Sequence, residues 1–154
     1  MIPSINEVST KRVVTIDEKA AFGEASAIMY AHKIRHLPVV NRLGKLVGVL
    51  SQKDRPFSES EWGQQVCELM SSPVEVAHEK SSLTVVMETM LSKKISSVVV
   101  VDDQSDIIGI VTTEDVLRYF LRILREEESR LDSSAFSRMQ LVGQVMHSLA
   151  QAGI

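Results

Sequence analysis

Two segments of the sequence share a pattern of side chains that could bind a nucleotide. Residues 48–54 and residues 109–115 both read glycine, two aliphatic residues, a hydroxyl residue, two variable residues and aspartate. An apolar strand that ends in this way offers a wall for a flat base, and Gly48 or Gly109 would allow close approach of its backbone. The pattern therefore indicates a site for a planar ligand at the end of each strand.

The hydroxyl and acidic residues of these segments suit the rest of a nucleotide. Ser51 and Thr112 stand where a helix is expected to begin, and there the unpaired backbone N–H groups and the helix dipole favour phosphate oxygens. Asp54 and Asp115 follow three residues later, and each carboxylate could accept from two vicinal ribose hydroxyls. Together these groups describe a site for a nucleoside phosphate.

The same residues have a purely structural interpretation. A hydroxyl residue followed three positions later by an acid is also the pattern of a capping box, which starts a helix without binding anything. For a single copy the capping box would be the preferred interpretation. Because the pattern occurs twice in the same register, we expect ligand binding by at least one copy.

These segments are parts of a longer internal repeat. Residues 5–55 align with residues 66–116 without a gap, at an offset of 61. Each copy reads strand, helix, strand, strand, helix, and its apolar strands lack the polar alternation of a half-exposed sheet. The sequence thus predicts an α/β (α+β) fold of tandem β-α-β-β-α repeats, with small sheets packed between helices. The expected strands are 13–16, 37–40 and 46–50 in the first copy, and 74–77, 98–101 and 107–111 in the second.

The two copies differ where the last helix of the first should begin. Arg55-Pro56 replaces Val116-Leu117, and proline is tolerated only in the first turn of a helix, so this helix should be short. In the second copy Ser81 is the expected helix cap. The predicted organisation is a first repeat over 1–57, a linker helix over 58–70, a second repeat over 71–124 and a helical tail over 125–154, whose last helix lies between Ser134 and Gly153.

Composition narrows the class of protein. The hydrophobic fraction of 44%, the charged fraction of 24% and a net charge of −3 are those of an ordinary soluble domain with no general attraction for polyanions. We therefore expect no binding of a nucleic-acid duplex and no membrane insertion. The single cysteine, Cys67, cannot form an internal disulfide, and residues 1–7 lack the long apolar run of a signal peptide, so we expect a cytoplasmic location.

Catalysis and metal binding are not expected. Ser51, His36 and Asp54 are a possible hydrolytic trio, but the sequence has no glycine-x-serine-x-glycine elbow and no phosphate-binding glycine loop. His32 and His36 have the spacing of a metal pair on a helix, yet no acidic or cysteine motif accompanies them. We predict no catalytic residue, no metal ligand and no obligatory cofactor.

The repeated segments, the run 34–40 (Ile-Arg-His-Leu-Pro-Val-Val) and the run 68–71 (Glu-Leu-Met-Ser) resemble the cystathionine-β-synthase-type (CBS) domain family. The resemblance covers roughly residues 5–121 and is to the paired form, called a Bateman module. It implies two sheets packed with pseudo-twofold symmetry and two related clefts, which in this family hold AMP, ADP, ATP, S-adenosylmethionine or cyclic dinucleotides. It also implies that each cleft takes residues from both repeats.

By this resemblance the ligand-binding residues fall into two groups. One cleft would combine Arg12, Thr15, Ser51, Lys53 and Asp54 with Ser96 and Ser97. The other would combine Ser72, Val74, Thr112, Glu114 and Asp115 with Arg35 and His36. In the first group, Arg12 and Lys53 would meet phosphates. In the second, Arg35 and His36 would neutralise the charge of a phosphate, and the negative charge of Glu114 would repel it.

The sequence supports two functions from different classes. The first is a regulatory module that binds an adenine nucleotide or a related adenosyl ligand between its repeats and transmits the binding to an unknown regulated protein. The second is an assembly module with vestigial clefts that acts through its C-terminal helices. By the family resemblance, and because residues 116–124 are strongly apolar, we expect a homodimer.

Overall fold

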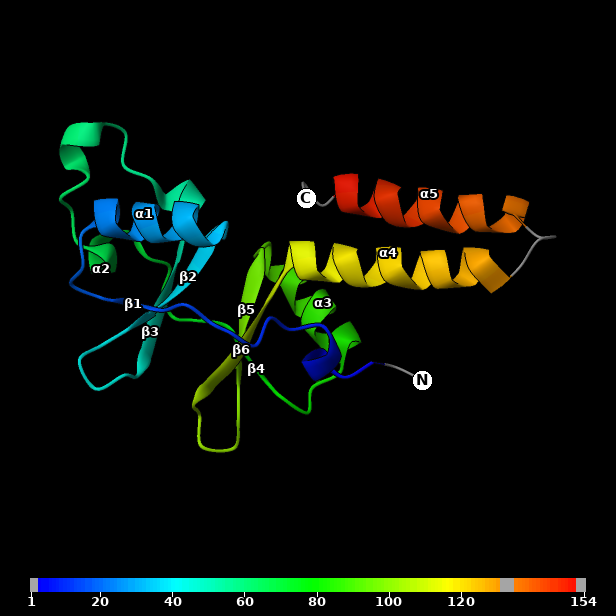
Figure 1. Cartoon of the computed structure of the whole chain (residues 1–154), viewed down its shortest axis with the longest axis horizontal. Coiled ribbons are helices and arrows are strands. Elements are labelled where there is room, and N and C mark those ends of the chain that lie inside the picture. The colour runs from blue at the N-terminus through cyan, green and yellow to red at the C-terminus, as the bar shows by residue number, and fades with distance from the viewer. Residues whose placement is uncertain (1–2, 131–134, 152–154) are drawn as a thin grey trace. The chain divides into compact units, whose positions relative to one another are not determined.

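The computed structural model of the chain describes residues 3–130 and 135–151, with side chains described outside 129–141 (Figure 1). The chain divides into two compact units, each of which is described by itself. The terminal unit comprises residues 1–10, 80–98 and 111–154, and the central unit comprises residues 11–79 and 99–110.

Both copies of the repeat contain the predicted succession of strand, helix, strand, strand. The first copy has β1 (Ile16–Asp17), α1 (Phe22–His32), β2 (His36–Val40) and β3 (Leu46–Ser51), and the second has β4 (Val76–His78), α3 (Leu83–Lys93), β5 (Ser97–Val101) and β6 (Ile107–Thr112). The two sheets have the orders β1-β2-β3 and β4-β5-β6. Strand β2 pairs in parallel with β1 and antiparallel with β3, and β4 pairs in parallel with β5.

The middle strands are buried as their composition predicts. The three central residues of β2, 37–39, and of β5, 98–100, are all buried. Runs of β-branched and other apolar residues with no exposed alternate position are typical of strands covered on both faces. In the central unit the core is closed by α1, the three strands of the first sheet and α2. It consists of Ile16, Phe22, Ala25, Met29, Leu37, Val39, Leu50 and Val66.

The first strands and one helix cap differ slightly from expectation. Strands β1 and β4 begin later than the predicted 13–16 and 74–77, because only their last residues reach the register of the middle strand. Helix α3 is capped by Ser82 rather than Ser81. The backbone of Ser82 is extended, and its hydroxyl accepts a hydrogen bond from the N–H of Val85 at 3.3 Å.

Helices α1 and α3 end in the same left-handed turn. Lys33 and Lys94, which are equivalent at the offset of 61, have φ angles of 54° and 53°. In the first copy the next residue, Ile34, donates its N–H to the carbonyl of Met29 at 2.9 Å and so closes the helix. This C-terminal turn usually contains glycine, because a Cβ atom destabilises the left-handed conformation. Both repeats use lysine instead.

The segments that open the two copies ahead of β1 and β4, here called the lead segments (residues 3–9 and 64–70), are exchanged between the copies. The first contains the short helix η1 (Ile5–Glu7), and Ile5 donates its N–H to the carbonyl of Ser81, just before α3 of the second copy, at 3.1 Å. The second contains α2 (Val66–Leu69), and Val66 donates its N–H to the carbonyl of Ala20, just before α1 of the first copy, at 2.9 Å. Both Ile5 and Val66 are fully buried.

The linker helix predicted over 58–70 is wrong as a single element. The structure has the short helix η3 (Glu59–Glu61) and then α2, with residues 62–65 between them. The carbonyls of Trp62 and Gln64 accept hydrogen bonds, each at 2.9 Å, from the N–H groups of Gly23 and Phe22 at the start of α1. A continuous helix would use these carbonyls for its own backbone bonds, so the linker satisfies the N-terminus of α1 instead.

The remaining helices agree better with prediction. The helix after β3 is reduced to the single turn η2 (Gln52–Asp54), as the proline at position 56 predicts. Helix α4 (Thr113–Arg130) runs from the second repeat into the predicted tail, and α5 (Ala135–Gln151) follows, while the predicted caps Ser134 and Gly153 lie outside the described residues. Within the described part of the chain, every helix is too short or too polar to cross a bilayer.

Candidate ligand-binding turns

The first candidate site is the turn from β3 into η2, called the first turn (Ser51–Asp54). Ser51 donates its backbone N–H to Asp54 Oδ2 at 2.7 Å, and Lys53 donates its backbone N–H to the Ser51 hydroxyl oxygen at 3.2 Å. This is the reciprocal pattern of a capping box. The structural interpretation of the serine and aspartate is therefore confirmed as local geometry.

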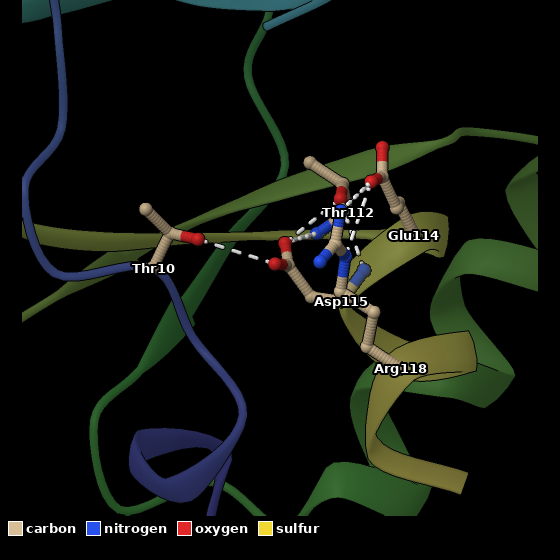
Figure 2. A network of polar contacts seen from close by, with 5 residues as sticks. All are labelled: Thr10, Thr112, Glu114, Asp115 and Arg118. Carbon is tan, nitrogen blue, oxygen red and sulfur yellow. Dashed lines mark hydrogen bonds and ion pairs between the residues drawn. The ribbon is translucent and has the colours of Figure 1, made fainter. Parts of the chain in front are cut away.

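The second candidate site is the turn from β6 into α4, called the second turn (Thr112–Asp115; Figure 2). Thr112 donates its backbone N–H to Asp115 Oδ2 at 2.8 Å and its hydroxyl to the same oxygen at 2.7 Å. Asp115 returns its own backbone N–H to Thr112 Oγ1 at 3.3 Å. The second turn is thus also a capping box, and it starts a helix of 18 residues.

The two aspartates differ in how many hydrogen-bond donors they already face. Asp54 accepts one hydrogen bond, on Oδ2, among the residues that the structure describes. Asp115 accepts two on Oδ2, and Oδ1 accepts a third at 3.1 Å from the hydroxyl of Thr10 (Figure 2). Because an ionised carboxylate offers about four lone-pair positions, Asp54 keeps more capacity than Asp115 for the hydroxyls of a ribose.

The variable positions give the two turns different charge. Lys53 of the first turn is exposed, and at the equivalent position of the second turn stands Glu114. Arg118, one helical turn later, donates through Nε to Glu114 Oε1 at 3.1 Å, as Figure 2 shows. The hydrogen bond to Glu114, and then its negative charge, raise the pKa of the Arg118 guanidinium. The first turn therefore has an exposed positive charge, whereas Glu114 of the second turn is paired with Arg118.

Each turn lies next to the residues that precede the second strand of its own copy. In the central unit, Gln52 donates its N–H to the carbonyl of Arg35 at 2.9 Å, and His36 is the register partner of Ser51. In the terminal unit, Thr113 donates its N–H to the carbonyl of Ser96 at 3.1 Å. Directly opposed residues of an antiparallel pair have side chains on the same face, so His36 and Ser51 are neighbours.

The predicted site residues divide between the units. Arg12 and Thr15 are exposed ahead of β1, Ser72 and Val74 precede β4, and Ser97 begins β5. The central unit contains Arg12, Thr15, Arg35, His36, Gly48, Ser51, Lys53, Asp54, Ser72, Val74 and Gly109, and the terminal unit contains Ser96, Ser97, Thr112, Glu114 and Asp115. The two predicted clefts combine residues of both units, so their composition stays a prediction.

Gly48 lies directly beside Met70. A Cβ atom at this position would lie 2.2 Å from Met70 Sδ and 2.8 Å from Met70 Cγ, so the methionine side chain occupies the space beside the glycine. Met70 belongs to the second lead segment and packs against the core of the central unit. The side of Gly48 on which a Cβ atom would stand is therefore filled by a core side chain, and the predicted contact of its backbone with a base stays a prediction.

Thr10 is the residue at these turns that the sequence interpretation missed. It has no motif of its own, and it lies far from Asp115 in the sequence. At the offset of 61 it aligns with Ser71, so a hydroxyl residue occupies this position in both copies. That shared hydroxyl was the available signal.

The fold and the two turns define a class of protein: a tandem repeat in which each copy ends its sheet on a hydroxyl-acid turn. The model of the CBS domain family matches residues 5–54 and 66–122, so the chain belongs to the CBS domain family, as a pair of such domains. The matched segments form a non-catalytic module. The expected pairing of two repeats is confirmed.

Individual relatives agree with this assignment. The chain is 34% identical over 119 residues to the L-aspartate semialdehyde sulfurtransferase of Methanocaldococcus jannaschii, covering 77% of this chain and 23% of that protein. It is 30% identical over 132 residues to the inosine-5′-monophosphate dehydrogenase of the same organism, covering 84% of this chain and 26% of that protein. The chain thus spans about a quarter of the length of these relatives.

A solved structure extends the comparison to bound ligands. The CBS domain pair of protein MJ0100, crystallised in complex with 5′-methylthioadenosine and S-adenosyl-L-methionine, is 34% identical to this chain. It superposes with a TM-score of 0.72 and covers 78% of this chain and 97% of its own. A CBS domain pair similar to this chain therefore binds adenosyl ligands.

Proposed function

We propose that the chain is a ligand-sensing regulatory module whose first and second turns hold the ribose of an adenosyl ligand. The observation that carries this proposal is the repeated placement of Asp54 and Asp115, each at the start of a helical turn beside a hydroxyl residue. The same capping box that orders the turn fixes one carboxylate oxygen and leaves the other directed to further donors. A vicinal diol is the ligand group that uses this arrangement most fully.

The class of ligand follows from two further observations. The relative of known structure binds 5′-methylthioadenosine and S-adenosyl-L-methionine, which share the adenosine group and lack a phosphate. In this chain the first turn has the exposed Lys53, which would favour an added phosphate, whereas Glu114 of the second turn would not. We therefore propose adenosyl ligands in general, with AMP, ADP or ATP at the first turn as the phosphorylated alternatives.

Regulation requires that the ligand prefers one conformation of the module. A ligand shifts an equilibrium only by its difference in affinity between two states. The second turn forms the N-terminus of α4. A ligand held there would therefore bias the pose of a long helix that a partner protein could contact. In this proposal the partner is an enzyme or another protein regulated by adenosyl-ligand concentration.

The proposal is tested by calorimetric titration of 5′-methylthioadenosine, S-adenosylmethionine, AMP, ADP and ATP. Thermal unfolding with each compound is the second measurement. A ligand at a hundred times its Kd stabilises the native state by about 2.7 kcal/mol, so the melting temperature should rise by about 5 to 10 °C. Asp54→Asn and Asp115→Asn should each weaken binding at their own turn by roughly 10- to 100-fold, because hydrogen bonds to a charged group are removed.

Asp17→Asn is the matched control for these variants. Asp17 also accepts a backbone hydrogen bond in a turn, from Lys19 at 2.8 Å, but it lies after β1 and outside both candidate turns. Its substitution should leave affinity unchanged. If none of the five compounds raises the melting temperature or releases heat on titration, the proposal of an adenosyl-binding module is wrong.

A second candidate function is assembly through the C-terminal helices. Leu121 of α4 is 51% exposed, and Val145 and Met146 of α5 are 42% and 57% exposed, so both helices present large apolar side chains at the surface. We propose a homodimer as the state that would cover them. Sedimentation of wild type against Leu121→Glu and Met146→Glu tests this candidate, and a wild-type monomer at micromolar concentration would exclude it.

A further inference from the structure

The hydroxyl of Thr10 contacts the carboxylate that the proposed function assigns to ribose. Thr10 Oγ1 donates to Asp115 Oδ1 at 3.1 Å, across a sequence separation of 105 residues but within the terminal unit. Figure 2 shows Thr10 facing Asp115 from the opposite side to Thr112. A donor hydroxyl on Oδ1, with Oδ2 satisfied by the capping box, is the arrangement that one ribose hydroxyl would make.

Thr10 is held in this position by the lead segment of the first copy. The helix η1 is capped by Ser4, whose hydroxyl accepts from the N–H of Asn6 at 3.2 Å. The N–H of Ser9 bonds to the carbonyl of Ile5 at 2.9 Å, and Ile5 is itself bonded to Ser81 ahead of α3. Thr10 directly follows Ser9. Its place beside the second turn is therefore fixed by the two backbone hydrogen bonds of Ile5, one from its N–H to Ser81 and one to its carbonyl from Ser9.

The first turn lacks this contact. Its equivalent residue at the offset of 61 is Ser71, whose N–H bonds to the carbonyl of Val49 at 2.9 Å and whose carbonyl accepts from the N–H of Val49 at 3.1 Å. Among the described residues, Ser71 makes no side-chain hydrogen bond to Asp54. The two turns thus have the same capping box. They differ at the Oδ1 atom of the aspartate, which accepts a hydrogen bond from a threonine hydroxyl in the second turn and not in the first, among the described residues.

We infer that Thr10 is the residue that makes the two turns unequal: its hydroxyl substitutes for a ribose hydroxyl on Asp115. An adenosyl ligand then fills the first turn at lower concentration and must displace Thr10 to bind the second. This inference rests on the proposed function. Displacement also connects ligand binding at the second turn to the lead segment, because the hydroxyl that leaves belongs to the residue that directly follows this segment.

The test isolates each turn and then removes the hydroxyl. Thr10→Val keeps the shape of the side chain and deletes the donor, Thr10→Ser keeps the donor, and Ser71→Ala deletes the equivalent hydroxyl. Each is made in the Asp54→Asn background, where the second turn is intact, and in the Asp115→Asn background, where the first turn is intact. The probe titrated by calorimetry is whichever of 5′-methylthioadenosine and AMP binds wild type more tightly.

In the Asp54→Asn background we expect Thr10→Val to tighten binding by about fivefold, the effect of one exposed hydrogen bond that no longer competes. Thr10→Ser should stay within about twofold of its parent, and Ser71→Ala should have no effect. In the Asp115→Asn background Thr10→Val should change nothing.

Three results would overturn the inference. If Thr10→Val weakens binding at the second turn, the hydroxyl assists the ligand or orients Asp115. If Thr10→Val leaves affinity unchanged while Asp115→Asn abolishes binding there, Thr10 is a bystander and the proposed function survives. If wild type binds neither probe and no compound of the larger panel, the inference fails together with the proposed function.

Discussion

Substituting Gly48 by alanine should destabilise the protein through a collision with Met70. The added Cβ would lie 2.2 Å from Sδ, 2.8 Å from Cγ and 3.2 Å from Cβ of that methionine. Sδ and Cγ can rotate away, but Met70 packs against the buried core and its Cβ cannot move without the backbone. Overpacking of this kind costs about 1–3 kcal/mol, which lowers the melting temperature of a chain this size by roughly 2 to 12 °C.

The assay is a double-mutant cycle measured by urea unfolding. Met70→Ala removes the colliding atoms, so Gly48→Ala should cost close to nothing in that background, with a coupling energy of about 1–3 kcal/mol. Gly143→Ala is the control, because no atom lies within 4 Å of its ideal Cβ position and alanine should stabilise α5 by about 0.5–1 kcal/mol. Equal costs of Gly48→Ala with and without Met70 would refute the packing explanation.

Three further predictions concern stability. Leu37→Ala should cost about 2–5 kcal/mol by urea unfolding, because the side chain is fully buried at the centre of β2, and a loss below 1 kcal/mol would contradict the assigned core. Thr112→Val should cost about 1 kcal/mol by the same measurement, since it removes the N-cap hydroxyl of α4, whereas Thr112→Ser should not. Lys33→Gly and Lys94→Gly should each raise the melting temperature by a few degrees, because glycine relieves the left-handed conformation at φ 54° and 53°, and a decrease would show that the lysine side chains stabilise those turns.

The elements were predictable because two aligned copies constrain each other. The strand, helix, strand, strand order was predicted in both copies, and the middle and last strands lie within about one residue of their expected bounds. The capping boxes could also be predicted from the sequence, since serine or threonine followed by aspartate at the third position is a local signal. Local patterns of this kind depend on sequence neighbours alone.

What sequence could not give depends on contacts between distant segments. An alignment of the copies compares each segment with its equivalent, but it does not say which copy the segment packs against. The exchange of Ile5 and Val66 could therefore not be predicted. The linker was expected to be one helix because the carbonyls of Trp62 and Gln64 were not known to bond to α1. Thr10 was missed for the same reason, since only the fold brings it to Asp115.

The exchange of lead segments has a consequence for the origin of the chain. A polypeptide with one copy would leave the carbonyl of Ala20 and the N–H of Phe22 without the partners that residues 64–66 supply. Such a polypeptide could satisfy them by borrowing the equivalent segment from a second molecule. Gene duplication would then have fused a reciprocally swapped homodimer into one chain, and a gene cut between the repeats should yield two fragments that fold only when mixed.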